Sequence, residues 1–318
     1  MKVLIGYDGS QSADAIFEDL KRAGLPRDTQ VMVAAVGDLL MNSPPVQELA
    51  AQIVSSPRVA AGIKRAELHA GRIIKEAEEF ASQAADRLRA EFPEWDVEKR
   101  VIKGTPAWEL IDAANEWKAD LVVVGSEGRS ALGRLLLGSV SKRVVTDSRC
   151  SVRVARRVVR KKENKPPKII VGIDGSAAAE AAVREVGQRI WQAGTQVRLI
   201  VARDHPSTAG IAARLPRAAG MIAEFNQSSA QRADLMLKWA MYQLKSIGLN
   251  VSMTIQRGDP KRILLEEARR WNADCIFVGT RDFKNSFERF RLGSVSTAVV
   301  NNAGCSVEVV RRDEEGQN

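Results

Sequence analysis

The chain has 318 residues, of which 45% are hydrophobic and 27% charged, a composition that excludes a disordered protein and a length that suits two domains. No apolar run approaches the roughly 20 residues of a membrane-spanning helix, and the start, MKVLIGYDGS, lacks the long apolar region of a signal peptide, so we expect a cytoplasmic protein with no membrane contact. The net charge of +9 comes with only 5% aromatic residues, which argues against specific binding of nucleic acid.

The first half begins with a strand at residues 2–7, and Asp8-Gly9-Ser10 then forms a turn that leads into a helix. A second strand is predicted at 30–36. Residues 42–63 contain several prolines and give no clear pattern, and a long helix is expected over 67–92.

The first half continues with a strand at 97–102 and a helix that starts at Pro106, where a first helical turn tolerates proline. The run Leu121 to Val124 reads as a fully buried parallel strand. A glycine-containing loop follows, then a helix from Val140 and a last strand at 151–155. Strands that alternate with helices predict a doubly wound α/β sandwich with a mostly parallel sheet.

The second half repeats the first. Asp8-Gly9-Ser10 recurs as Asp174-Gly175-Ser176, and Leu137-Gly138-Ser139-Val140-Ser141 recurs as Leu292-Gly293-Ser294-Val295-Ser296. Further matches occur in the same order along the chain. The sequence is therefore a tandem duplication of a unit of about 150 residues.

The repeat sets the predicted domain boundaries at residues 1–155 and 168–312. The segment between them, 156–167, is basic and contains Pro166 and Pro167, so we interpret it as an exposed linker, with a basic docking surface as the alternative. Residues 313–318 read as a polar tail. The hydrophobic last strand of each unit would leave an exposed edge, and we expect the two units to pair through these strands. The sequence leaves a further homodimer open.

One stretch of the first unit has the features of an anion site. Gly125 ends a buried strand, Gly128 follows, and Gly138-Ser139 precedes a helix. Glycine lets the backbone approach a ligand, and the free N–H groups at a helix start attract phosphate. The alternatives are that these glycines only form turns and that Asp8 only hydrogen-bonds its own turn. The Walker pattern GxxxxGK[ST] is absent.

The spacing Gly-x2-Gly-x9-Gly-Ser resembles the ATP-binding signature of the universal stress protein family. With the Asp-Gly-Ser and Gly-x-Pro turns, the resemblance covers nearly the whole chain as two copies. It implies a tandem protein in which each unit is an open α/β sandwich with a five-stranded sheet. Some members of the family bind ATP, and others have lost the glycine signature.

The resemblance also implies roles for individual residues. Asp8 would contact the adenosine part of ATP, and Val36 would flank the adenine. The phosphates, with Mg²⁺ as a companion ion, would lie among backbone N–H groups and the hydroxyl of the glycine signature, at Gly125, Gly128, Gly138 and Ser139. Arg129 and Arg134 lie within this loop, where they either add charge or point to solvent.

The second unit departs from the signature. Asp282 stands where the second glycine belongs, and one extra residue precedes Gly293. An aspartate brings negative charge to a place meant for phosphate. Only Asp174, Gly293 and Ser294 remain as a weaker second site, so we expect this unit to bind ATP weakly or not at all and to serve packing or a protein partner.

Little in the sequence indicates catalysis. No Walker-B strand ending in aspartate accompanies the loop, and Glu127, the carboxylate closest to the expected phosphates, is interpreted as solvated. The cysteines Cys150, Cys275 and Cys305 have no CxxC spacing and are expected to be buried hydrophobic residues, and the two histidines form no metal or triad pattern.

The leading hypothesis is a stress-response protein that binds ATP in its first unit and acts as a nucleotide-dependent sensor or regulator, without being an enzyme. The alternative is a protein-interaction scaffold whose glycine loop is structural and whose partner is unknown. A slow ATP hydrolase is a third, less favoured hypothesis.

Overall fold

The structure is a computed structural model that describes residues 1–38, 57–127, 137–156, 165–203, 216–280 and 292–311. Each half contributes five strands and the helices between them. The first half contains β1 (Lys2–Gly6), α1 (Gln11–Leu20), β2 (Gln30–Asp38), α3 (Pro57–Glu91), β3 (Asp96–Gly104), α4 (Pro106–Trp117), β4 (Leu121–Gly125), α5 (Ser139–Asp147) and β5 (Ser151–Ala155). The second contains β6 (Lys168–Ile173), α6 (Ala177–Gln188), β7 (Gln196–Arg203), α8 (Pro216–Ser246), β8 (Asn250–Arg257), α9 (Pro260–Trp271), β9 (Cys275–Gly279), α10 (Ser294–Asn302) and β10 (Ser306–Val310).

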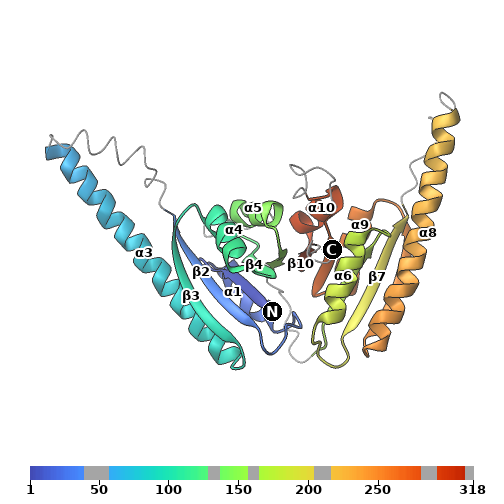
Figure 1. Cartoon of the computed structure of the whole chain (residues 1–318), viewed down its shortest axis with the longest axis horizontal. Helices are drawn as coiled ribbons and strands as arrows, with labels where there is room; N and C mark the ends of the chain where they lie inside the picture. The colour runs from blue at the N-terminus through green and yellow to red at the C-terminus, as the bar shows by residue number, and fades with distance from the viewer. Residues whose placement is uncertain (39–56, 128–136, 157–164, 204–215, 281–291, 312–318) are drawn as a thin grey trace.

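The strands form a single ten-stranded sheet with the order β3-β2-β1-β4-β5-β10-β9-β6-β7-β8. Within each half all neighbouring strands are parallel, as the βαβ alternation requires. The two halves meet where β5 runs antiparallel to β10. The predicted fold class, two tandem α/β units, is confirmed, and the structure adds that the two sheets are continuous (Figure 1).

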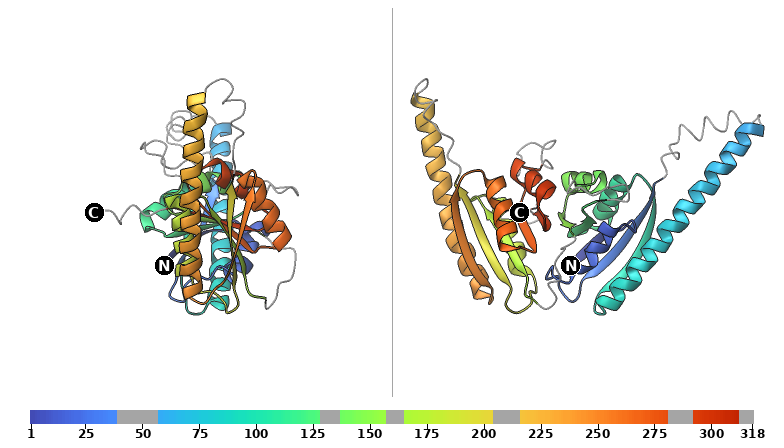
Figure 2. Two further views of the ribbon diagram at one scale, coloured as in Figure 1. Left: turned by 90° about the vertical axis from the view of Figure 1, so that its right-hand side faces the viewer. Right: turned by 180° about the vertical axis from the view of Figure 1, so that it is seen from behind.

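Helices cover both faces of the sheet. On one face, α4, α5, α9 and α10 pack over a hydrophobic core that continues from one half into the other. On the opposite face, α1 and α3 cover a separate core in the first half, and α6 and α8 cover another in the second. The long helices α3 and α8 lie on the outer flanks of the molecule in both front and back views (Figures 1 and 2).

The local sequence explains where two of these helices begin. The Ser10 hydroxyl accepts a hydrogen bond from Ala13 N at 3.1 Å and caps α1. The helix α3 begins at Pro57, earlier than the predicted start near Glu67. The prediction was wrong there because proline is favourable as the first residue of a helix, and it was read only as a breaker.

The first residue of the segment between the halves is buried. Arg156 is only 5% exposed, and its Nη2 donates to Val300 O at 2.5 Å, so the expectation of an exposed linker is wrong at this position. Burial of the aliphatic stem and capture of a carbonyl oxygen explain why this arginine lies inside. Residues 157–164 lie outside the described part of the chain.

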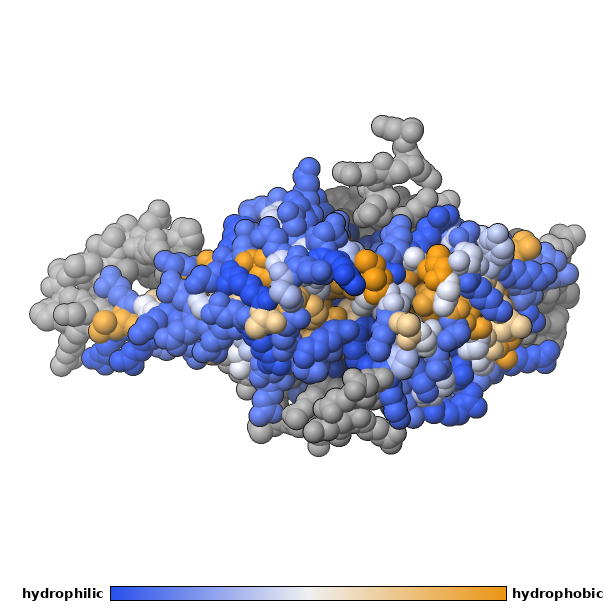
Figure 3. Space-filling view, turned by 90° about the horizontal axis from the view of Figure 1, so that it is seen from below, coloured by the Kyte–Doolittle hydropathy of each residue, from blue (hydrophilic) through white to orange (hydrophobic). Residues whose placement is uncertain are grey.

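Most of the underside of the molecule is hydrophilic, and apolar residues gather in a band along its middle (Figure 3).

Within the described residues, no helix combines the length and apolarity that crossing a bilayer requires.

Candidate functional site

The neighbouring strands β1 and β4 bring together the two motifs that the sequence singled out. These strands are parallel and in register, with Gly6 opposite Val124, so the Asp8 turn and Gly125 emerge at the same edge of the sheet. On either side, β1 pairs with β2 and β4 pairs with β5, which makes this edge the point where the strand order reverses. Open α/β sheets bind their ligands at such a point.

Asp8 has a structural role in this turn. Its Oδ1 accepts a hydrogen bond from Ser10 N at 3.0 Å, and Gly9 between them has a φ of +74°, which favours glycine. Asp8 also lines a cavity at the edge of the sheet. Asp8 therefore does hydrogen-bond its own turn, as the structural alternative predicted. The same turn places the carboxylate where a ligand can reach it.

The start of α5 forms the opposite side of the edge. Gly138 is the N-cap residue and provides no side-chain cap. The first turn of α5 lines the cavity, so N–H groups without a capping side chain lie in its wall. Gly138 N donates to Ser126 O at 2.8 Å, and the Ser141 hydroxyl donates to Gly125 O at 2.6 Å. These two hydrogen bonds fix the helix start against the end of β4.

The cavity between these elements has a volume of about 450 Å³, within the range of small-molecule sites. One wall combines the end of β2 with α3 and is mostly apolar, with Asp38 and Glu76 as its carboxylates, and the other is polar and combines the Asp8 turn with the start of α5. The lining residues are Gly6, Tyr7, Asp8, Ala13, Ala34, Ala35, Val36, Asp38, Ile73, Glu76, Ala77, Phe80, Pro106, Leu110, Val124, Gly125, Glu127, Gly138, Ser139, Val140 and Ser141.

The charges of this described lining are all acidic. Asp8, Asp38, Glu76 and Glu127 contribute carboxylates, and no lysine or arginine is among the described lining residues. The positive end of the site is the N-terminus of α5, whose N–H groups carry partial positive charge. Beside the cavity, Tyr7 donates to Asp14 Oδ1 at 2.7 Å, and burial with this hydrogen bond raises the pKa of Tyr7, so the phenol stays neutral.

The structure places most of the predicted site residues together. Asp8, Val36, Gly125, Gly138 and Ser139 all line the cavity. Gly128, Arg129 and Arg134 lie outside the described residues. Sequence reasoning missed the contribution of α3, including Phe80 and Glu76, because the helical pattern shows which residues share a face but not which strand ends that face covers.

Gly125 has a packing role that is independent of any ligand. A methyl group at this position would lie 2.9 Å from the carbonyl carbon and oxygen of Ser12, at the start of α1. We therefore predict that Gly125→Ala lowers the free energy of unfolding by about 1–3 kcal/mol, because the backbone of Ser12 must move. Urea denaturation measures this loss. Gly304→Ala is the matched control, since a methyl group there meets nothing within 4 Å, and an equal loss in the two variants would contradict the prediction.

The corresponding edge of the second half has the same turn and the same helix start, but the packing around the turn differs. Ser176 N donates to Asp174 Oδ1 at 2.9 Å, and Gly293 is the N-cap of α10. However, a methyl group on Gly175 would lie 2.7 Å from the backbone nitrogen of Ala233, whereas on Gly9 it would meet the side chain of Phe80. The backbone of α8 thus lies directly against the turn. Asp282 lies outside the described residues.

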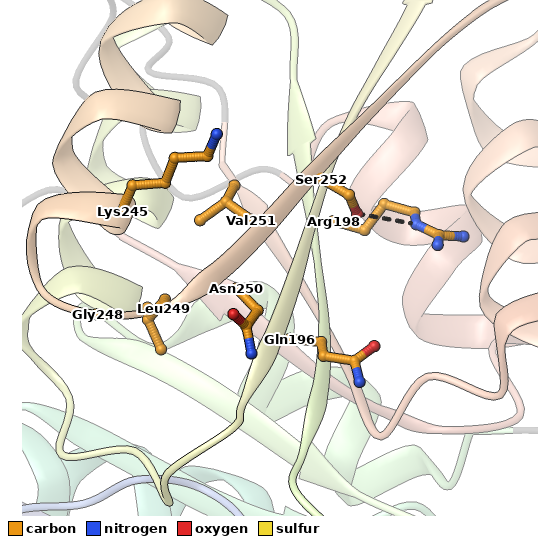
Figure 4. A pocket seen from close by; sticks show the side chains of 8 residues that line it. All are labelled: Gln196, Arg198, Lys245, Gly248, Leu249, Asn250, Val251 and Ser252. Atoms are coloured by element: carbon orange, nitrogen blue, oxygen red, sulfur yellow. Dashed lines mark hydrogen bonds between the residues drawn. The ribbon is translucent and has the colours of Figure 1, made fainter.

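A larger hollow, of about 640 Å³, lies near the starts of β7 and β8 and the end of α8 (Figure 4). It is a surface groove with two cationic lining residues, Lys245 and Arg198, and Arg198 is already engaged. Arg198 donates to Ser252 at 3.3 Å and to Glu267, and it stacks over Trp271 at 4.2 Å. The smaller cavity beside Asp8 is the stronger candidate because its polar groups converge on an enclosed space.

Cysteine chemistry and metal binding find no support in the described residues. Cys275 and Cys305 are buried, Cys150 is partly buried, and all three are free thiols. Burial raises the pKa of Cys275 well above its usual value, so this thiol is protonated and inert. Within the part of the chain that the structure describes, no cluster of three or more metal-ligating side chains occurs.

Comparison with known proteins agrees with this architecture. The model of the universal stress protein family matches the chain twice, at residues 1–156 and 166–311. The chain belongs to the universal stress protein family. The resemblance that the glycine spacing indicated is thereby confirmed, as is its tandem form.

This universal stress protein has relatives of similar length. A universal stress protein of Mycolicibacterium smegmatis is 27% identical over 311 residues, which span 97% of this chain and 96% of that protein. Another, from Mycobacterium tuberculosis, is 30% identical over 221 residues, or 68% of this chain and 69% of its own length. Among solved structures, a universal stress protein from Archaeoglobus fulgidus shares the fold, with a TM-score of 0.61, 21% identity and 98% coverage of both chains.

Proposed function

We propose that this universal stress protein binds ATP in the cavity of its first unit, residues 1–155, and acts as a nucleotide-dependent sensor or regulator in the stress response. The second unit, residues 168–312, serves packing or a protein partner. The observation that carries the proposal is the convergence of Asp8 and the uncapped start of α5 on one cavity at the strand-order reversal.

The cavity offers a matching environment for each part of the nucleotide. The apolar wall with Val36 and Phe80 suits the adenine ring, and the Asp8 carboxylate suits a ribose hydroxyl. The N–H groups of the first turn of α5, from Ser139 onward, suit the phosphates. Because the described lining carries carboxylates and no cationic side chain, we propose that the nucleotide enters as its Mg²⁺ complex, which offsets the repulsion between these charges.

The proposed role is binding rather than catalysis. Phosphoryl transfer needs metal ligands and a group that positions water, and the sequence gives no Walker-B aspartate after β4. A protein-interaction scaffold remains the alternative function, because Gly125 and the Asp8 turn also have structural roles. Measuring whether the purified chain binds adenine nucleotide separates the two functions.

The sharpest single test replaces one carboxylate oxygen. Asp8→Asn keeps an oxygen that can accept from Ser10 N, so the turn is retained, but it removes the charge that we assign to the ribose contact. We expect the affinity for Mg·ATP to fall about tenfold, because a hydrogen bond to a charged group is worth about 1.5–3 kcal/mol and part of it is kept. Isothermal titration calorimetry gives the dissociation constant.

Asp174→Asn is the matched control. It changes the same turn in the second unit, where Asp174 also accepts from the backbone two residues on. The affinity for Mg·ATP should stay unchanged, and one nucleotide should bind per chain. If Asp174→Asn weakens binding as much as Asp8→Asn does, the assignment of the site to the first unit is wrong.

A further inference from the structure

The contact between β5 and β10 has a symmetric pair of hydrogen bonds at its two ends. Arg156 N donates to the Ser306 hydroxyl at 3.0 Å, and at the equivalent position of the second unit Arg311 N donates to the Ser151 hydroxyl at 3.1 Å. The side chain of each arginine also bonds carbonyl oxygens in the opposite half. Such an interface, related by a local two-fold axis, would also fit two copies of the same unit.

The symmetry breaks on the axis itself. In the antiparallel register Arg153 of β5 lies directly opposite Glu308 of β10, with Val154 opposite Val307 and Val152 opposite Val309. The repeated motif Cys-Ser-Val places Arg153 and Glu308 at equivalent positions of the two units. A residue on the axis would face its own copy in a pair of identical units. Here it faces the opposite charge.

Both side chains are buried, at 1% and 0% exposure, and all their charged atoms are engaged. Arg153 Nη1 donates to Glu308 Oε2 at 2.9 Å, and its Nε and Nη2 donate to the two oxygens of Asp19 at 2.6 and 2.9 Å. Arg189 Nη2 donates to Glu308 Oε1 at 2.5 Å. These charges also separate the two hydrophobic cores on the α1 and α6 face of the sheet.

The surrounding contacts follow the same asymmetry. Arg189 also donates to Ala23 O of the first unit at 3.1 Å, and Ala23 is the residue that the repeat places at the position of Arg189. Arg22 bonds both oxygens of Asp274 in the second unit, at 3.2 and 2.9 Å. The interface is therefore built from two different, complementary surfaces.

We propose that the Arg153–Glu308 pair makes this interface selective, so that the last strand of each unit accepts its partner unit and rejects a second copy of itself. Two first units would place two guanidinium groups across the axis and leave Arg153 Nη1 without its acceptor, although Asp19 still neutralises each one. Two second units would place two buried carboxylates across the axis, although Arg189 of the same unit still pairs with each Glu308. In either like pair, like charges face each other at a buried position and lose the hydrogen bond between Arg153 and Glu308, which disfavours the complex.

Selective pairing has a consequence for assembly. The edges of β5 and β10 are paired with each other within one chain. A second copy of the chain must therefore bind through another surface. The first unit, which contains the cavity, always has the second unit of its own chain as its neighbour. This inference does not depend on nucleotide binding.

The test starts from the full chain with a site-specific protease sequence inserted within residues 157–164. After cleavage of the folded protein, two preparations that differ in isotope label are mixed, allowed to exchange units, and analysed by native mass spectrometry. We expect the ratio of unlike pairs to each kind of like pair to be at least about ten times the ratio that random pairing gives. Like pairs in the proportions of random pairing would overturn the proposal.

Two single variants give opposite expectations. Glu308→Gln removes the carboxylate repulsion, so pairs of two second units should appear while pairs of two first units stay absent. Arg153→Gln should do the reverse. Arg100→Gln, which changes an exposed ion pair with Glu116 far from the axis, should leave the pattern of the unmodified protein. If both axial variants remain as selective as the unmodified protein, or if both gain the same pairs, the axial charges do not set the selectivity.

Discussion

Replacement of Ser139 by aspartate is expected to lower the affinity for Mg·ATP by about 100-fold, or about 2.7 kcal/mol. Ser139 is exposed and is the first residue of α5, so the new carboxylate would stand where we place the phosphates. The fold should tolerate the change, because an aspartate in a first helical turn is stabilising by about 0.3–1 kcal/mol. Calorimetric titration gives the affinity, and thermal denaturation checks the fold.

Adenosine and a second position provide the controls for this experiment. Adenosine has no phosphate, so its affinity should change little in Ser139→Asp. Ser294→Asp adds the same charge to the exposed first residue of α10 in the second unit and should leave the affinity for Mg·ATP unchanged. An unchanged affinity in Ser139→Asp, or an equal loss for adenosine, would show that the phosphates do not lie at α5.

Replacement of Arg153 by leucine is expected to lower the free energy of unfolding by about 3–5 kcal/mol, because it leaves buried carboxylates without their partner. Asp19 loses both of its hydrogen bonds to Arg153, and Glu308 keeps only Arg189. Asp19 and Glu308 hold the pKa of Arg153 well above its usual value against the opposing effect of burial, so the charge is present at every accessible pH.

Urea denaturation at low and high salt tests this second result. The loss should persist at high salt, because buried pairs are poorly screened. Arg100→Leu is the control, since Arg100 and Glu116 form an exposed ion pair at 3.0 Å, and it should change stability by less than about 1 kcal/mol. A loss in Arg153→Leu no larger than in the control would mean that the buried network contributes nothing to stability.

Several features of the site could be predicted from local sequence. The Asp8 turn, the buried run of β4 and the glycine before α5 are short-range signals, and each one sets the backbone within a few residues. Parallel strands end at the same edge, so the meeting of Asp8 with Gly125 and Ser139 followed from topology. Phe80 and Glu76 could not be predicted, because the position of α3 over that edge depends on packing between distant segments.

The sequence by itself determined the tandem repeat, the α/β class and the strand ends that carry the candidate site, because these depend on periodicity and on residues close in the chain. Only the tertiary structure decided that Arg156 is buried, that α8 lies against the second turn, and that Arg153 faces Glu308. A charged residue in a strand pattern does not reveal its partner. The partner is set by the register of two strands from opposite halves, which comes from the packing of the whole interface.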